Sequence, residues 1–354
     1  MVSISFVGDI SLNDEYTKLI REGVQPFRDL NGDLAGSDFV VGNLECLATG
    51  NRGENLKKKP RLKTDLQTLG YLKQLNVGMA CLAHNHVYDN LEDGFIKTLA
   101  YLERNNIRHL GASLDDPSGN PSVQIALKGM QFAFFNYVDK DTNPSLPDHA
   151  GISLSILDKE KILHDLSKSG EANFRILILH WGGRWENSYF PGPKQISLAR
   201  EFISAGADLI IGHHPHTLQP SFSYMGKSVF FSLGNFCFAD IKSDDRIKMI
   251  KYRRSKESAI LKVEFTREGY RTSLIPFRIE KLHTVKDRGV LRRLKRRQWY
   301  FNLIRYSRLL WYIYYFGFKY LRPVIWELGK KDPERNLIKK ISGLNKDKVK
   351  GLFK

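Results

Sequence analysis

The 354-residue sequence is poor in cysteine, and its cysteines form no recognisable framework. Cys46, Cys81 and Cys237 include no Cys-x-x-Cys pair, and each lies within an apolar segment. Such an odd, sparse set argues against disulfide staples and a thiolate zinc site, and it favours a reducing compartment. The N-terminus enters a strand-like run without the basic region, long apolar segment and cleavage site of a signal peptide. We therefore expect a cytoplasmic protein.

The sequence also lacks a long hydrophobic run. The longest, LLWYIYYFGF at residues 309–318, is flanked by Arg308 and Lys319. It has about half of the roughly 20 apolar residues that a membrane-spanning helix needs. The sequence therefore predicts no spanning helix.

The positive charge is confined to one end of the chain. Residues 281–354 contain 21 Lys and Arg against 5 Asp and Glu, whereas residues 1–280 contain 34 against 33, and the net charge is +17. We therefore expect a near-neutral domain over 1–280 and a basic C-terminal extension over 281–354. This asymmetry argues against nucleic-acid binding by the whole protein.

The near-neutral part has the pattern of an α/β domain. Short apolar segments rich in β-branched residues alternate with amphipathic segments, and the last strand-like run ends near Ile279. Apolar residues at three- and four-residue spacing predict helices over residues 65–75, 94–105 and 193–205.

Six polar clusters each follow the end of a strand-like run. In an α/β sheet the carboxyl ends of the strands meet at one edge, and ligands bind at that edge. One cluster alone would be a cap, a turn or a structural histidine, but six of the ten histidines fall in three of the clusters. Oxygen and imidazole donors without sulfur suit Mn, Fe, Zn or Co. The clusters are GDI with Asp9, GNLE with Asn43 and Glu45, HNH with Asn85 and His86, HWGG with His180, GHHPH with His213, His214 and His216, and GN with Asn235.

The GHHPH cluster is rigid because it contains Pro215. Proline fixes its own φ and excludes the helical region for the residue before it. We therefore expect His214 and His216 to project from an extended backbone.

The ordered motifs GDI, GNLE, NH with Asp89, HWG, GADLIIGHHPHTLQP and SLGNF resemble the CapA family of capsule and poly-γ-glutamate synthesis proteins. The domain of that family is similar to the calcineurin-like metallophosphoesterases. The resemblance covers about residues 2–280. It implies a four-layer α/β/β/α sandwich with two mixed sheets, here followed by a basic, aromatic helical tail.

The resemblance implies a site for two divalent metal ions, with Mn, Fe or Zn expected. Asp9 and His216 would bind one ion, Glu45 would bridge, and His86 would protonate the leaving group. The ligands implied for the other ion are Asn85, His180 and His214. The positions implied for substrate contact or for support of the ligands are Asn43, Asp89, Arg184, Glu186, His213 and Asn235.

Two positions depart from the family pattern. Phosphoesterases carry a histidine two residues after the first aspartate, where this chain has Ser11. CapA proteins usually have a glutamate where this chain has Arg184, with Glu186 two residues further on. These departures predict either a weakly occupied first metal position or a different contact with substrate.

These features predict metal-dependent phosphoester hydrolysis in the synthesis or export of an extracellular polymer. The expected ligand is an anionic polymer or a phosphorylated intermediate. The alternative is a non-catalytic subunit of an envelope-polymer assembly, with metals absent or structural.

The C-terminal extension has three interpretations. Residues 286–326 combine the basic run RRLKRR with a stretch rich in tyrosine and tryptophan. This combination favours an anionic membrane surface or a membrane synthase complex, with the protein peripheral on the inner face of the cytoplasmic membrane. A C-terminal helix packed on the domain is the second interpretation. A nucleic-acid-binding arm is the least favoured.

Overall fold

The computed structural model describes residues 1–243, 247–249 and 253–321, so residues 322–326 of the aromatic segment lie outside the described part. The chain divides into two compact units, Met1–Gln298 and Trp299–Lys354. The boundary falls later than the expected residue 280, because the intervening residues pair and pack with the first unit. No helix in the described ranges is both long and apolar enough to cross a membrane.

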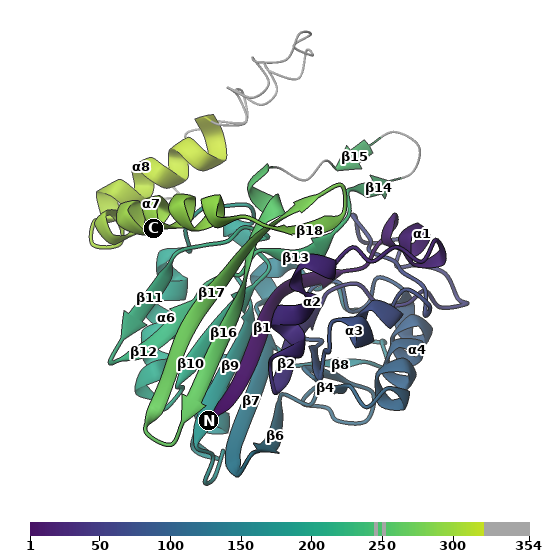
Figure 1. Ribbon diagram of the computed structural model, residues 1–354, viewed down its shortest axis with the longest axis horizontal. Helices are drawn as coiled ribbons and strands as arrows, with labels where there is room; N and C mark the ends of the chain where they lie inside the picture. Colours follow the sequence, from purple (N-terminus) through teal and green to yellow (C-terminus); the bar gives the residue numbers. More distant parts are fainter. Residues whose placement is uncertain (244–246, 250–252, 322–354) are drawn as a thin grey trace. The chain divides into compact units, whose positions relative to one another are not determined.

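Two mixed sheets form the centre of the first unit (Figure 1). The larger sheet has the order β18-β17-β16-β1-β2-β3-β4, with β13 also paired to β1, and the second has the order β11-β12-β10-β9-β7-β6. The strands of the larger sheet are β1 (Val2–Ser11), β2 (Phe39–Leu44), β3 (Met79–Cys81), β4 (Arg108–Leu110), β13 (Asn235–Phe238), β16 (Glu257–Thr266), β17 (Gly269–Glu280) and β18 (His283–Lys286). Those of the second are β6 (Ser122–Leu127), β7 (Met130–Val138), β9 (Phe174–His180), β10 (Leu209–His213), β11 (Ser221–Tyr224) and β12 (Lys227–Phe230).

Helices and short ribbons complete the structure. Two-stranded ribbons pair β5 (Ala112–Ser113) with β8 (Ser153–Leu154), and β14 (Ile241–Ser243) with β15 (Ile247–Met249). The helices are α1 (Tyr16–Arg21), α2 (Arg28–Ala35), α3 (Gly70–Gln74), α4 (Leu91–Arg104), α5 (Lys159–Ser167), α6 (Pro193–Ser204), α7 (Arg288–Ile304) and α8 (Arg308–Phe316). Short turns of 3-10 or π-helix cover Lys140–Thr142, Gly183–Trp185, Arg253–Lys256 and Gly317–Leu321.

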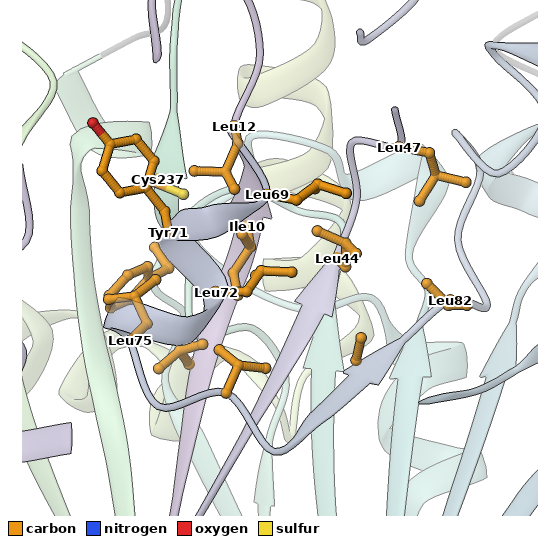
Figure 2. Close-up of a cluster of buried hydrophobic side chains, with 14 of the residues drawn as sticks. Ile10, Leu12, Leu44, Leu47, Leu69, Tyr71, Leu72, Leu75, Leu82 and Cys237 are labelled. Carbon is orange, nitrogen blue, oxygen red and sulfur yellow. The ribbon is translucent and has the colours of Figure 1, made fainter. Parts of the chain in front are cut away.

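The two largest buried clusters of the hydrophobic core lie between the sheets and outside the larger sheet. Ile4 of β1 and Phe132 of β7 belong to a single buried cluster, so the two sheets pack face to face. Figure 2 shows the other layer, in which Leu72 of α3 lies among residues of β1 and β2. These apolar faces remove most of the strand surface from water, which is the main force holding the layers together.

The outer face of the second sheet is covered by α5 and α6. The hydroxyl of Tyr137 on β7 donates a hydrogen bond to Asp165 on α5. The guanidinium of Arg200 on α6 lies over the ring of Phe222 on β11. With helices outside both sheets, the predicted four-layer α/β/β/α sandwich is confirmed.

Two of the three predicted helices form nearly as expected, and the third is much shorter. The helices predicted over 94–105 and 193–205 are α4 and α6. The segment 65–75 is α-helical only over α3, because the turns before it close with i→i+3 hydrogen bonds, from the amide of Gly70 to the carbonyl of Gln67 and from the amide of Tyr71 to the carbonyl of Thr68. Such tighter turns are frequent at the N-terminus of a helix.

The end of the first unit contains elements that the sequence placed in the C-terminal extension. β18 pairs with β17 beyond the last predicted strand. Val290 and Leu294 of α7 share a buried cluster with Leu218 and Ala259. The interpretation of a helix packed on the domain therefore describes residues 288–298 of α7.

Candidate metal centre

The polar clusters meet where strands of both sheets end. Asp9 on β1 lies in register with Asn43 on β2, and His180 on β9 lies in register with His213 on β10. Glu45 directly follows β2. Because the strands within each of these pairs run parallel, their carboxyl ends carry these side chains to a common edge.

A close approach between two glycines fixes Asp9. A Cβ atom on Gly8 would lie 2.0 Å from the carbonyl oxygen of Gly234. That carbonyl accepts a hydrogen bond from the amide of Asp9 at 3.0 Å. Gly8 therefore lets β13 pair against the end of β1, and this pairing positions the carboxylate of Asp9.

Asp9 is completely buried and accepts hydrogen bonds from several donors. His213 Nδ1 lies 2.9 Å from Oδ1, His216 Nδ1 lies 3.1 Å from Oδ2, and Asn43 Nδ2 donates to Oδ1 at 2.9 Å. Burial alone would raise the pKa of Asp9, but the hydrogen bonds from the two histidines outweigh it and hold the pKa well below its ordinary value. These donors therefore favour the charged form of Asp9.

Asp9, Glu45 and His216 form what we call the anionic half of the centre. One ligand atom from each lies within 4.8 Å of the others, and all three residues are buried. His216 Nε2 lies 3.5 Å from Glu45 Oε1, and His216 Nδ1 lies 2.9 Å from Asn235 Oδ1. Two carboxylates and an imidazole are a suitable donor set for a divalent cation.

Asn85, His180 and His214 form the neutral half. His180 Nε2 lies 3.0 Å from Asn85 Oδ1, and the ring centroids of His180 and His214 are 4.9 Å apart. Burial lowers the pKa of His214 to about 3 and that of His180 well below its ordinary value. Neutral imidazoles keep the lone pairs through which histidine binds metals.

Asn43 connects the two halves. Its Nδ2 group, which donates to Asp9, also lies 3.4 Å from His180 Nδ1. The side chain is completely buried, so it fixes Asp9 and His180 relative to each other.

The backbone of GHHPH differs from the expected extended conformation. His214 has φ of +92° and His216 has φ of +53°, which places both in a region that side-chain-bearing residues rarely adopt. The prediction from Pro215 was therefore wrong about the conformation. Beyond its own φ, proline restricts only the residue before it, so it does not fix His216, and at His214 the positive φ accompanies a hydrogen bond from the backbone amide to Asp9 Oδ2 at 3.4 Å.

His86, Asp89 and Lys58 form a buried chain beside the two halves. His86 Nδ1 lies 2.5 Å from Asp89 Oδ2, and its Nε2 lies 3.8 Å from Glu45 Oε1. Burial lowers the pKa of His86 to about 4 although Asp89 opposes the shift. With its Nδ1 proton held by Asp89, neutral His86 presents Nε2 toward the centre as an acceptor.

Lys58 was not identified from the sequence. Its Nζ atom lies 3.2 Å from Asp89 Oδ1 and donates to the carbonyl oxygen of Asn85, and its side chain is only 6% exposed. Burial lowers the pKa of Lys58, while Asp89 and Glu45 oppose that shift. Lys58 stands in the run KKKPRLK, which has the composition of a solvated loop, so no local signal marks it.

The remaining predicted positions lie at the margin of the centre. Arg184 and Glu186 are exposed at the turn Gly183–Trp185, and Glu186 is close enough to raise the pKa of His214 against the effect of burial. Ser11 is buried, and its hydroxyl donates to Asn13 Oδ1 at 2.7 Å.

The residues present fit divalent cations. Within the described part of the chain, the buried Nδ1 atom of His214 has no hydrogen-bond partner. A buried polar atom of this kind costs free energy unless a ligand satisfies it. Together with the anionic oxygens of the other half, it forms a donor set of oxygen and imidazole nitrogen without sulfur, which suits Mn, Fe or Zn.

Comparison with protein families identifies the chain. The model of the family described as bacterial capsule synthesis protein PGA_cap matches residues 3–240, which include all six polar clusters. The chain belongs to this family. The resemblance to CapA proteins drawn from the motifs is thereby confirmed.

Individual relatives agree with this assignment. The PGA biosynthesis protein CapA of Bacillus subtilis is 29% identical over 283 residues, which are 76% of this chain and 69% of that protein. The capsule biosynthesis protein CapA of Bacillus anthracis is 27% identical over 282 residues, 76% of this chain and 65% of that protein. The chain thus matches about two thirds of the length of either relative.

A solved structure supports the fold. A hypothetical protein from Thermus thermophilus superposes with a TM-score of 0.50 at 12% identity, over 78% of this chain and 99% of that chain. At this identity the similarity concerns the fold alone.

Proposed function

We propose that this member of the capsule synthesis family is a metal-dependent hydrolase with a dinuclear centre. Its substrate would be a phosphorylated intermediate or an anionic polymer in the synthesis or export of a capsular polymer. The observation that carries the proposal is the adjacency of the anionic and neutral halves, joined through Asn43. Two donor sets side by side are the arrangement that two-metal hydrolysis requires.

The two halves would have different tasks. Asp9 and Glu45 supply negative charge, so the anionic half would bind a cation strongly. Asn85, His180 and His214 bring no negative charge, and a cation held there would keep more of its attraction for an anionic substrate. Ions in both places would activate a water molecule and stabilise charge that develops on a phosphoryl oxygen.

His86 would handle the proton. Asp89 fixes the orientation of its ring through Nδ1, so that Nε2 faces the centre. An incoming phosphoryl dianion would raise the pKa of His86, because a nearby negative charge favours the imidazolium. His86 would then take up a proton from water on Nε2 and donate it to the leaving oxygen.

A metal-resolved activity screen tests the proposal. The full chain is reconstituted with Mn²⁺, Fe²⁺ or Zn²⁺, and metal content is measured alongside hydrolysis of a phosphomonoester, a phosphodiester and a γ-glutamyl peptide. We expect about two equivalents of metal and phosphoester turnover. The double variant His180→Ala/His216→Ala should lose both metal and activity.

His86→Ala separates proton transfer from metal binding. The variant should keep its metals and lose about 10²- to 10⁴-fold in kcat, the range for general acid–base catalysis. His109→Ala is the matched control, since His109 lies outside the centre on β4. A wild-type chain that stays metal-free after reconstitution and is inert on all three substrates would instead support the non-catalytic subunit.

A further inference from the structure

Exposed hydrophobic side chains are concentrated in one short segment. Of the fourteen large hydrophobic side chains exposed in the described residues, nine lie between Trp299 and Leu321. Single exposed apolar residues are normal on a protein surface, but a concentrated group marks an interaction site.

On α8 the exposed residues form one continuous face. Leu309, Tyr312, Ile313 and Phe316 are 67%, 40%, 59% and 37% exposed, whereas Trp311 is 6% exposed. These four positions have the spacing i, i+3, i+4, i+7, which puts them on the same side of a helix. An ordinary surface helix turns such a stripe inward, whereas these four side chains of α8 are exposed, which is typical of a site that binds a partner.

The charges and residue types of the segment indicate what that partner is. Residues 299–321 contain Arg305, Arg308 and Lys319, eleven aromatic residues and no Asp or Glu. Tyrosine and tryptophan prefer the interface between headgroups and hydrocarbon, and each basic residue near an anionic bilayer adds about 1 kcal/mol of attraction.

Other partners fit this surface less well. A second copy of the chain would bring the same cations together without an acid from this segment to compensate them. Single-stranded nucleic acid would use aromatic rings for stacking, but Leu309 and Ile313 are aliphatic and contribute two of the four side chains on the α8 face.

We propose that residues 299–321 bind the surface of an anionic lipid bilayer, with the exposed face of α8 inserted among headgroups and acyl chains. A helix as short as α8 would lie in the plane of the interface. This attachment is independent of the metal centre, and its test does not involve hydrolysis.

Vesicle flotation with the full chain tests the proposal. Binding is compared between pure phosphatidylcholine vesicles and vesicles with about one third phosphatidylglycerol, at low and high salt. We expect binding to the anionic vesicles and loss of most of it at high salt. Binding to neither kind of vesicle would overturn the proposal.

Two matched isoleucine variants locate the contact. Ile313→Glu should weaken binding by about tenfold or more, because it puts a charge into the inserted face. Ile96→Glu makes the same change at a position on α4 that is 43% exposed, and it should leave binding unchanged. If both variants bind like the wild type, or both lose binding equally, the face of α8 is not the contact.

A third variant and two further measurements complete the test. Arg308→Gln should weaken binding about fivefold, the factor that corresponds to about 1 kcal/mol per basic residue. Thermal unfolding of each variant checks that it folds, and Leu309→Glu replaces Ile313→Glu if the latter does not. An Ile313-dependent dimer in lipid-free solution, or Ile313-dependent binding of single-stranded RNA without vesicle binding, would overturn the proposal.

Discussion

In the anionic half of the centre, the buried carboxylate of Asp9 lies among imidazoles that donate to it, whereas in the neutral half imidazoles are held uncharged by burial. Asp9 receives hydrogen bonds from His213 and His216, so its charge is compensated within the protein. His214 has an Nδ1 atom that no described residue satisfies. The anionic half is therefore largely preformed, and the neutral half depends more on a ligand.

This difference shows that neighbouring polar clusters at one sheet edge can contribute oppositely to folding. A compensated charge such as that of Asp9 stabilises a chain that contains no metal, because the buried carboxylate has hydrogen-bond donors within the protein. A buried nitrogen without a partner costs free energy until a ligand arrives. Variants that remove one half at a time test this comparison.

The largest effect is expected from the carboxylate of the anionic half. Asp9→Ala should lower the free energy of unfolding by about 3–5 kcal/mol, because it leaves buried donors on Asn43, His213 and His216 without their acceptor. His180→Ala in the neutral half should cost only about 1–3 kcal/mol. Urea denaturation with a chelator present measures both, and equal losses would contradict the comparison.

The next largest effect is expected from Lys58, whose buried ammonium group lies beside both halves. Lys58→Met should destabilise the chain by about 3 kcal/mol, because Asp89 keeps a buried charge with one cationic partner fewer. Lys63→Met is the matched control. Lys63 is 51% exposed and pairs with Glu54 at 2.8 Å, so its loss should cost less than about 1 kcal/mol. Similar losses would show that the buried lysine is not an essential counter-charge.

A somewhat smaller change in stability is expected from the loss of metal binding in one half. In His180→Ala we expect one equivalent of metal to remain in the anionic half. Metal at 100 times its dissociation constant stabilises a folded chain by about 2.7 kcal/mol per site, so the variant should lose one such increment relative to the wild type. Metal analysis and unfolding with and without added Mn²⁺ measure this. Loss of both equivalents would mean that the halves bind metal only together.

The sequence predicted which clusters converge, because strand ends and polar residues are local signals. The alternation of apolar runs placed Asp9, His180 and His213 directly at strand ends, and the structure has them there. What it could not predict depends on distant contacts. Lys58 is buried against residues distant in the sequence, such as Asp89, whereas the sequence around Lys58 has the composition of a polar loop.

The same limit explains the errors at the ends of elements. Backbone turns with i→i+3 hydrogen bonds, which periodicity does not detect, shorten the helix predicted over 65–75. β18 has only four residues and is stabilised by pairing with β17, so its sequence alone carries no strand pattern. The basic run RRLKRR favoured a membrane surface, yet its Arg297 pairs with Glu257 of β16 at 2.6 Å.

The smallest expected effect tests whether burial alone keeps the imidazoles of the neutral half uncharged. His109 lies outside the centre, and burial lowers its pKa although Glu103 opposes the shift. The unfolded chain, with a histidine pKa of about 6.5, then takes up a proton first as the pH falls. This contribution to stability is present above about pH 6.5 and is lost as the pH falls toward the lower pKa of the folded state.

The side chain of His109 is 20% exposed, so the loss of stability should stay below about 1 kcal/mol and should be absent in His109→Gln. NMR titration of His109 and urea denaturation at about pH 7 and about pH 5 measure both quantities. If the pKa of His109 is not lowered, partial burial does not keep an imidazole neutral in this chain. The neutrality of His180 and His214 would then require their complete burial.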